Sequence, residues 1–201
     1  MHPNVREFIE KHIDIIESED FTRLYDLAIV KLPNYEMRMG ELTKVLLDAD
    51  INPLNHMTSV PDYYYSEFET SEAPHVPNNI TEIGEFAFFN CDFETITIPS
   101  SVKKVRTSAF DFCTSLKTVI IEEGLESIGG NCFTDCTSLS QITLPKSLKR
   151  LAGSVFNRCP NLTTLKYNGT LDEWYNIEYY PNTFNGSSLT TLVCTDRTVE
   201  I

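Results

Sequence analysis

The chain has 201 residues, enough for one ordinary domain or two small ones. Its hydrophobic fraction of 41% and charged fraction of 22% are typical of a globular protein and exclude a disordered chain. A formal net charge of -13 argues against general binding of nucleic acid and of anionic membrane surfaces. No run of about 18 apolar residues is present, so the sequence predicts no membrane-spanning helix.

Residues 1–60 predict a small helical subdomain. Apolar side chains recur at helical spacing from Val5 to Ile16, and a second helix is expected after Ser18. The spacing predicts a third helix over 40–50. Three short helices bury little surface alone, so we expect them to cap the next part of the chain. A separate recognition module is the alternative.

Residues 61–75 are acidic with aromatic side chains interleaved, and they predict a linker. Residues 1–75 as a whole hold 6 basic and 15 acidic side chains, a net charge of -9. Within the linker, Tyr63, Tyr64 and Tyr65 are candidate contacts for a basic partner. The alternative is a half-ordered connection whose rings rest on the next element.

Residues 76–201 contain an internal repeat of about 23 residues. Its clearest markers are four phenylalanines spaced 22, 23 and 23 residues apart: Phe88, Phe110, Phe133 and Phe156. A cysteine follows each of them by three residues: Cys91, Cys113, Cys136 and Cys159. Next in each copy comes a short stretch of alternating apolar residues, typical of a strand with one face inward. A fifth, weaker copy begins at Phe184.

This period predicts a solenoid, because one such coil cannot bury its apolar face alone and stacked coils form a continuous core. The predicted fold class is therefore α+β. It consists of a five-coil solenoid with short parallel strands, preceded by a small helical N-terminal cap.

The units Ala109-Phe110-x-x-Cys113-x-x-Leu116-x-x-Val119 and Cys132-Phe133-x-x-Cys136-x-x-Leu139-x-x-Ile142 resemble BspA-type leucine-rich repeats. The resemblance covers roughly residues 76–201. It implies a small parallel sheet on one side of the solenoid and a role in protein binding or adhesion without catalysis. Tyr167-Asn168-Gly169-Thr170 with Trp174 is similar to the tail of short repeat proteins that bacteriophages encode.

The residues predict no catalytic site, no metal site and no cofactor. The sequence lacks G-x-G-x-x-G, Walker, G-x-S-x-G and H-E-x-x-H motifs. All four histidines precede the repeats, whereas all six cysteines lie within them. The repeated cysteines are expected to be reduced, inward-facing core residues that meet the backbone of a turn.

Two groups of residues are candidate contacts for a protein partner. The first is the segment around the only tryptophan, with Trp174, Tyr175, Tyr179 and Tyr180, because such side chains are enriched at binding hot spots. The alternative is a terminal repeat whose loop folds over the end of the core. The second is the outward side of the predicted strands, with Thr97, Ile120, Thr143, Lys166 and Val193. Five strands about 4.8 Å apart and about 15 Å long present about 350 Å². A standard interface needs about 800 Å² per partner, so this face alone is too small.

The sequence predicts a non-catalytic protein-protein interaction module, with no nucleic-acid or membrane partner. One alternative is a structural subunit that self-associates through its last strand, Leu189–Cys194, which lacks charge and proline unless Val199–Ile201 covers it. Another is an acidic, phage-type inhibitor of a host enzyme, suggested by the net charge of -9 on residues 1–75. The N-terminus has no apolar stretch of secretory type, so we expect a cytoplasmic or virion location.

Overall fold

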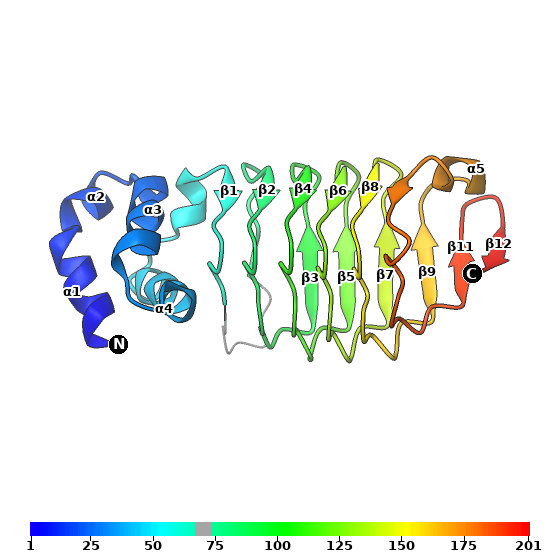
Figure 1. The fold of residues 1–201 in the computed structure, drawn as a ribbon. Helices are drawn as coiled ribbons and strands as arrows, with labels where there is room; N and C mark the ends of the chain where they lie inside the picture. Colours follow the sequence, from blue (N-terminus) through cyan, green and yellow to red (C-terminus); the bar gives the residue numbers. More distant parts are fainter. Residues whose placement is uncertain (67–73) are drawn as a thin grey trace.

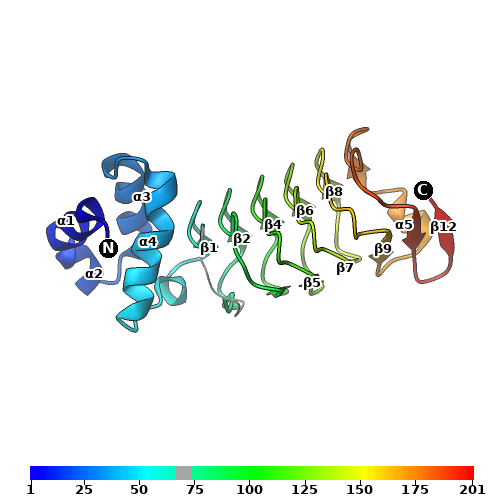
Figure 2. The ribbon, with the colours of Figure 1, turned by 90° about the horizontal axis from the view of Figure 1, so that it is seen from below.

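The computed structural model describes residues 1–66 and 74–201. Figure 1 shows the N-terminal helices at one end of a stack of coils and the C-terminus at the other. The coils form two parallel sheets, which Figure 2 shows along different sides of the stack. The fold class predicted from the sequence is therefore confirmed: a leucine-rich-repeat solenoid follows a few helices.

The helical region contains α1 (Pro3–Lys11), α2 (Ile13–Glu17), α3 (Phe21–Lys31), α4 (Tyr35–Asp48) and the 3-10 helix η1 (Pro53–His56). The single helix predicted up to Ile16 is interrupted at His12. There a ring nitrogen of His12 lies 2.7 Å from the Phe8 carbonyl oxygen. The backbone N–H of His12 donates to the Ile9 carbonyl oxygen rather than to that of Phe8. Helix α4 begins five residues before the predicted start because Asn34, at φ 53°, reverses the chain directly before it.

Sheet A carries one short strand per coil, in the order β1-β2-β4-β6-β8-β10. These strands are β1 (Ser59–Val60), β2 (Glu82–Ile83), β4 (Lys104–Val105), β6 (Ser127–Ile128), β8 (Arg150–Leu151) and β10 (Glu178–Tyr179). Sheet B has the order β12-β11-β9-β7-β5-β3. Its strands are β3 (Thr95–Ile98), β5 (Thr118–Ile121), β7 (Gln141–Leu144), β9 (Thr164–Tyr167), β11 (Thr191–Val193) and β12 (Thr198–Glu200). The short helix α5 (Leu171–Trp174) lies between β9 and β10.

The solenoid begins earlier than the predicted start near Val76. Strand β1 pairs in parallel with β2, with Ser59 opposite Glu82, so residues 59–66 belong to a first coil rather than to a linker. In this coil Tyr65 stands where the next coil has Phe88, and the two rings stack at 5.1 Å. The stack therefore has one coil more than the five predicted, and within the described residues sheet A contains six strands.

The repeated phenylalanines form a continuous stack of rings through the solenoid. Phe88 and Phe110 stack with centroids 4.9 Å apart, Phe110 and Phe133 at 5.3 Å, and Phe133 and Phe156 at 5.9 Å. All four rings are fully buried. Near-parallel rings at this spacing bury a large apolar area and fix the rotation of each coil relative to the next.

The repeated cysteines line the core beside the rings, as predicted, and they are free thiols. Each donates to a backbone carbonyl of the preceding coil: Cys91 to Tyr65, Cys113 to Phe88, Cys136 to Phe110 and Cys159 to Phe133, at 3.0–3.1 Å. The partners are backbone carbonyl oxygens, which accept from the S–H group, a weak donor.

The helices pack directly on the first coil. The Tyr25 ring of α3 lies 5.1 Å from that of Tyr64, and its hydroxyl is hydrogen-bonded to Thr43 of α4 at 2.7 Å. At Gly40 a side-chain Cβ would lie 2.1 Å from the Ser66 carbonyl oxygen, so only glycine lets α4 approach this closely. The helical core and the coil core are one continuous cluster.

Strand β12 covers the last parallel strand. It pairs antiparallel with β11, with Leu192 opposite Val199, so the segment proposed to cover the last strand does so. The uncapped edge on which the structural-subunit alternative rested is therefore absent at β11.

Replacing Phe133 by alanine is expected to lower the free energy of unfolding by about 3–5 kcal/mol, because the change removes a fully buried ring and two stacking partners. Urea denaturation followed by circular dichroism measures the change. Thr143→Ala, on the outward side of sheet B, is the control and should change stability by less than about 0.5 kcal/mol. Equal effects of the two substitutions would contradict the ring stack as a main source of stability.

Candidate interaction surfaces

The outward side of sheet B, which we call the strand face, brings together five of the predicted contact residues. Parallel pairing places Thr97 opposite Ile120, Thr143 opposite Lys166, and Lys166 opposite Val193. The remaining link, Ile120 opposite Thr143, continues the same row. Ile120 is 47% exposed, a large apolar side chain among threonines. Alternation along each strand forces these side chains outward while their neighbours enter the core.

The aromatic contact residues predicted around Trp174 separate in the structure. Trp174 is buried, 4% exposed, and its ring packs between those of Tyr167 and Phe184. Tyr175, Tyr179 and Tyr180 are exposed; Tyr179 belongs to β10 of sheet A rather than to the strand face. Trp174 is therefore a core residue of the last coil.

The contact residues predicted in residues 61–75 differ in their burial. Tyr64 and Tyr65 are buried in the junction and the first coil, so their rings are not on the surface. Tyr63 is half-buried, and its ring stacks on Phe86 at 4.9 Å. The remainder of the predicted acidic docking segment, 67–73, lies outside the described residues.

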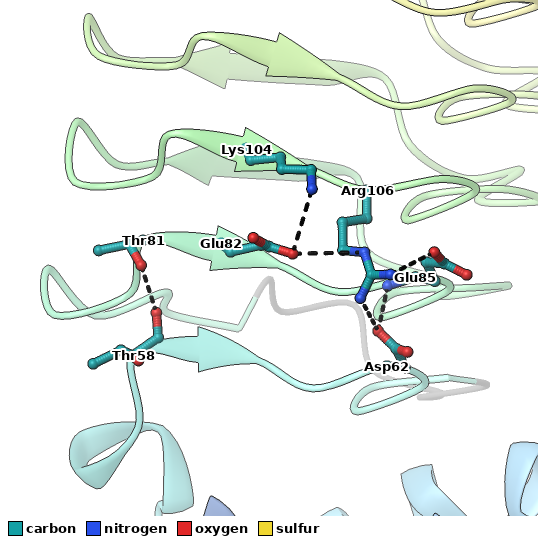
Figure 3. A network of polar contacts seen from close by, with 7 residues as sticks. All are labelled: Thr58, Asp62, Thr81, Glu82, Glu85, Lys104 and Arg106. Atoms are coloured by element: carbon teal, nitrogen blue, oxygen red, sulfur yellow. Dashed lines mark hydrogen bonds and ion pairs between the residues drawn. The ribbon is translucent and has the colours of Figure 1, made fainter.

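The outward side of sheet A carries ion pairs between successive coils, which we call the charge ladder (Figure 3). Arg106 is its centre: its guanidinium lies 2.8 Å from Glu85, 3.5 Å from Glu82 and 3.6 Å from Asp62. Lys104 adds a longer contact with Glu82 at 3.9 Å. Three carboxylates from two preceding coils therefore converge on one cation, which ties these coils together.

A third surface, missed in the sequence, follows sheet A in each coil. This turn face comprises residues 84–90, 107–112, 130–135 and 153–158. Each of its turns contains two residues with left-handed backbone, four positions apart: Phe86 and Asn90, Ser108 and Phe112, Asn131 and Asp135, Ser154 and Arg158. Asparagine, aspartate and serine are common in such turns, whereas bulky residues are strained there. Aligning the coils by their cysteines reveals three bulky residues at these positions: Phe86, Phe112 and Arg158.

The turn face also contains a buried carboxylate without a full set of partners. Asp111 is 9% exposed, and its Oδ1 accepts no hydrogen bond. Burial, together with the nearby charge of Asp135, raises the pKa of Asp111 to about 6, against the opposing effects of Ser108, the Phe112 N–H and Arg158. Arg158 itself is paired with Asp135, so the charge of Asp111 is left largely uncompensated.

The thiols are poor candidates for chemistry. Burial raises the pKa of Cys113 and of Cys159 to about 12, and it raises the pKa values of Cys132 and Cys136 well above the ordinary range. A protonated, buried thiol is neither a nucleophile nor a metal ligand. Within residues 1–66 and 74–201, no group of three or more His, Cys, Asp or Glu side chains is arranged to hold a metal ion. None of the helices in that same part is long and apolar enough to cross a bilayer.

The fold and these surfaces define a repeat scaffold whose exposed side chains project from a rigid stack of coils. The model of the BspA type leucine rich repeat region matches residues 58–190 in six copies, so the chain belongs to this family. No curated protein matches the chain.

Solved structures with this fold come from several bacteria. A leucine-rich repeat protein of T. pallidum is 23% identical, with 55% of this chain and 52% of that chain covered and a TM-score of 0.45. One from Bacteroides ovatus is 20% identical, with 70% and 53% covered and a TM-score of 0.43. One from Eubacterium ventriosum is 22% identical, with 67% and 44% covered and a TM-score of 0.46. The chain thus spans about half the length of these proteins.

Replacing Arg106 by methionine is expected to lower the free energy of unfolding by about 1 kcal/mol, because three carboxylates lose their shared cation. The loss should shrink in 1 M NaCl, where screening weakens the wild-type contacts. Lys117→Met is the matched control, since Lys117 contacts one exposed carboxylate, Glu94. Thermal unfolding at low and high salt measures both; equal losses would contradict a network centred on Arg106.

Asp111→Asn is expected to stabilise the protein at pH 8 by about 1 kcal/mol, or about 2–4 °C in Tm. The substitution removes a buried charge while the side chain keeps nearly the same shape. The folded-state pKa lies near 6, above the ordinary 3.8, so the wild type loses stability as pH rises through this interval. The gain should therefore shrink towards pH 4. Asp135→Asn is the control with the opposite sign, because it breaks the pair with Arg158. A gain for Asp111→Asn that does not vary with pH would contradict the assignment.

Proposed function

We propose that this protein is a non-catalytic protein-binding module that contacts its partner through the strand face. The observation that carries the proposal is the ordered row of outward side chains on sheet B, with Ile120 exposed at its centre. Paired strands hold these side chains without the entropy cost of ordering a loop, which favours binding. Membership in a leucine-rich repeat family supports an interaction role.

The small area of the strand face sets a requirement on the interface. At about 350 Å² it is less than half of the about 800 Å² that each partner contributes to a standard interface. A partner must therefore also contact a neighbouring surface, or bind weakly. The acidic-inhibitor alternative, the cytoplasmic or virion location and the bacteriophage association stay predictions.

The test is a pull-down with the tagged full chain from lysate of the source cell, at low and high salt, analysed by mass spectrometry. We expect a stoichiometric foreign protein whose purified form binds with an affinity reduced at least tenfold by Ile120→Asp, equivalent to about 1.4 kcal/mol. Ile13→Asp on α2 is the matched control, because Ile13 is 50% exposed and Ile120 is 47% exposed.

Two results would contradict the proposal. Recovery of the bait alone, in multiples of itself, would favour self-assembly. Equal binding by Ile120→Asp and by the wild type would show that the strand face is not the contact. Binding to a basic protein that disappears at high salt and does not respond to Ile120→Asp would instead support the acidic-inhibitor alternative.

A further inference from the structure

The turn face contains two aromatic residues in strained backbone conformations. Phe86 has φ 54° and Phe112 has φ 61°, a backbone conformation in which a bulky L-residue is strained. The position of Phe86 holds Ser108 in the following coil, and that of Phe112 holds Asn90 and Asp135 in the coils on either side. These residues suit such turns better, whereas Tyr63 and Arg158 share the strained conformation. Strain that a single substitution would relieve is characteristic of sites retained for function.

The rings of Phe86 and Phe112 lie together with that of Phe89, and all three are at least partly exposed. Phe112 is 42% exposed, and Phe86 and Phe89 are half-buried. The Phe86 and Phe89 centroids are 5.9 Å apart, and those of Phe89 and Phe112 are 5.7 Å apart. The rings are tilted strongly against one another rather than stacked. They form an apolar, π-rich patch over two adjacent coils, next to polar turns in the following two.

A buried negative charge lies within the same patch. Asp111 directly precedes Phe112 and occupies the same turn position as Phe89 one coil earlier; the Asn90 N–H donates to its backbone carbonyl. Its Oδ1 is without a hydrogen-bond donor, and the nearest guanidinium, Arg158, is engaged by Asp135. A carboxylate in a region of low dielectric acts strongly on a charge placed outside, even without direct contact.

Aromatic faces beside an uncompensated carboxylate form an environment that attracts an organic cation. Arginine suits it better than lysine, because its planar guanidinium stacks on rings and is more weakly hydrated. We propose that the turn face around Phe86, Phe89, Asp111 and Phe112 binds an arginine side chain of a protein partner. This inference rests on the proposed function, to which it adds a second contact surface and the chemistry of the partner. The net charge of -13 favours a basic partner of this kind.

The test uses the full chain labelled with ¹⁵N and three capped tripeptides, with arginine, citrulline or norleucine between two glycines. We expect millimolar binding of the arginine peptide, with amide shifts centred on residues 86–90 and 108–113, and at least tenfold weaker binding of the other two. Binding of the norleucine peptide as tightly as the arginine peptide would overturn the proposal, because the patch would then recognise apolar surface.

Two variants that are expected to fold make the test decisive. Phe112→Asn introduces the residue that the preceding coil has at this position, Asn90, and it should raise Tm while weakening arginine binding at least tenfold. Asp111→Asn should act in the same direction on both readouts. Ile120→Asn on the strand face is the control and should leave arginine binding unchanged.

Unchanged arginine binding in both turn-face variants, or shifts spread along the charge ladder instead, would overturn the proposal. Its failure is distinguishable from failure of the proposed function. A partner from the pull-down that is sensitive to Ile120→Asp but not to Phe112→Asn would leave the protein-binding function intact and remove the turn face from it.

Discussion

Stacking every coil on its neighbour in one register is the constraint on which the rest of this structure depends. In sheet B, Thr95 is opposite Thr118 and Thr118 is opposite Gln141, so the same offset of 23 residues recurs from strand to strand. Inside the core, the stacked rings are 22 or 23 residues apart, and each repeated thiol contacts the coil before it. A residue that faces inward therefore meets its own counterparts on both sides, and its size is limited by them.

This constraint separates the residues that build the scaffold from those that are free to vary. The phenylalanine and cysteine positions repeat because each contributes to the contact between two coils. The outward positions have no such limit, and they differ from coil to coil: Thr97, Ile120, Thr143 and Lys166 occupy one row. The residues that carry function in such a scaffold are therefore most easily recognised where a coil departs from the repeat, at the strand face and in the turns.

The sequence predicted the interior better than the surfaces. The Phe–Cys spacing identified the solenoid because these residues recur at positions where size and polarity are fixed by packing. The first coil was missed because Tyr65 replaces the phenylalanine, although its ring stacks on Phe88 in the same way. For Trp174 the sequence left a surface contact and a place in the core both open, because composition alone does not distinguish a contact residue from one that fills the core of an irregular last coil; the side chain is buried. The turn face was missed because its signal is conformational: a phenylalanine is unusual there only once φ is known to be positive.

The two ends of the stack are closed by different means, and this bears on where a partner binds. At the first coil, α3 and α4 cover the end through Tyr25 and the close approach at Gly40. At the other end, β12 runs antiparallel to β11, which reverses the chain and stops further parallel coils from adding in register. Helices thus cover the first coil of the solenoid and β12 covers the last parallel strand of sheet B, whereas sheet A ends at β10, where Tyr179 and Tyr180 are exposed. The exposed apolar side chains of the central coils, Phe112 and Ile120, lie on its sides, in a turn and on the strand that follows it. A partner that contacts both would gain area that neither surface provides alone.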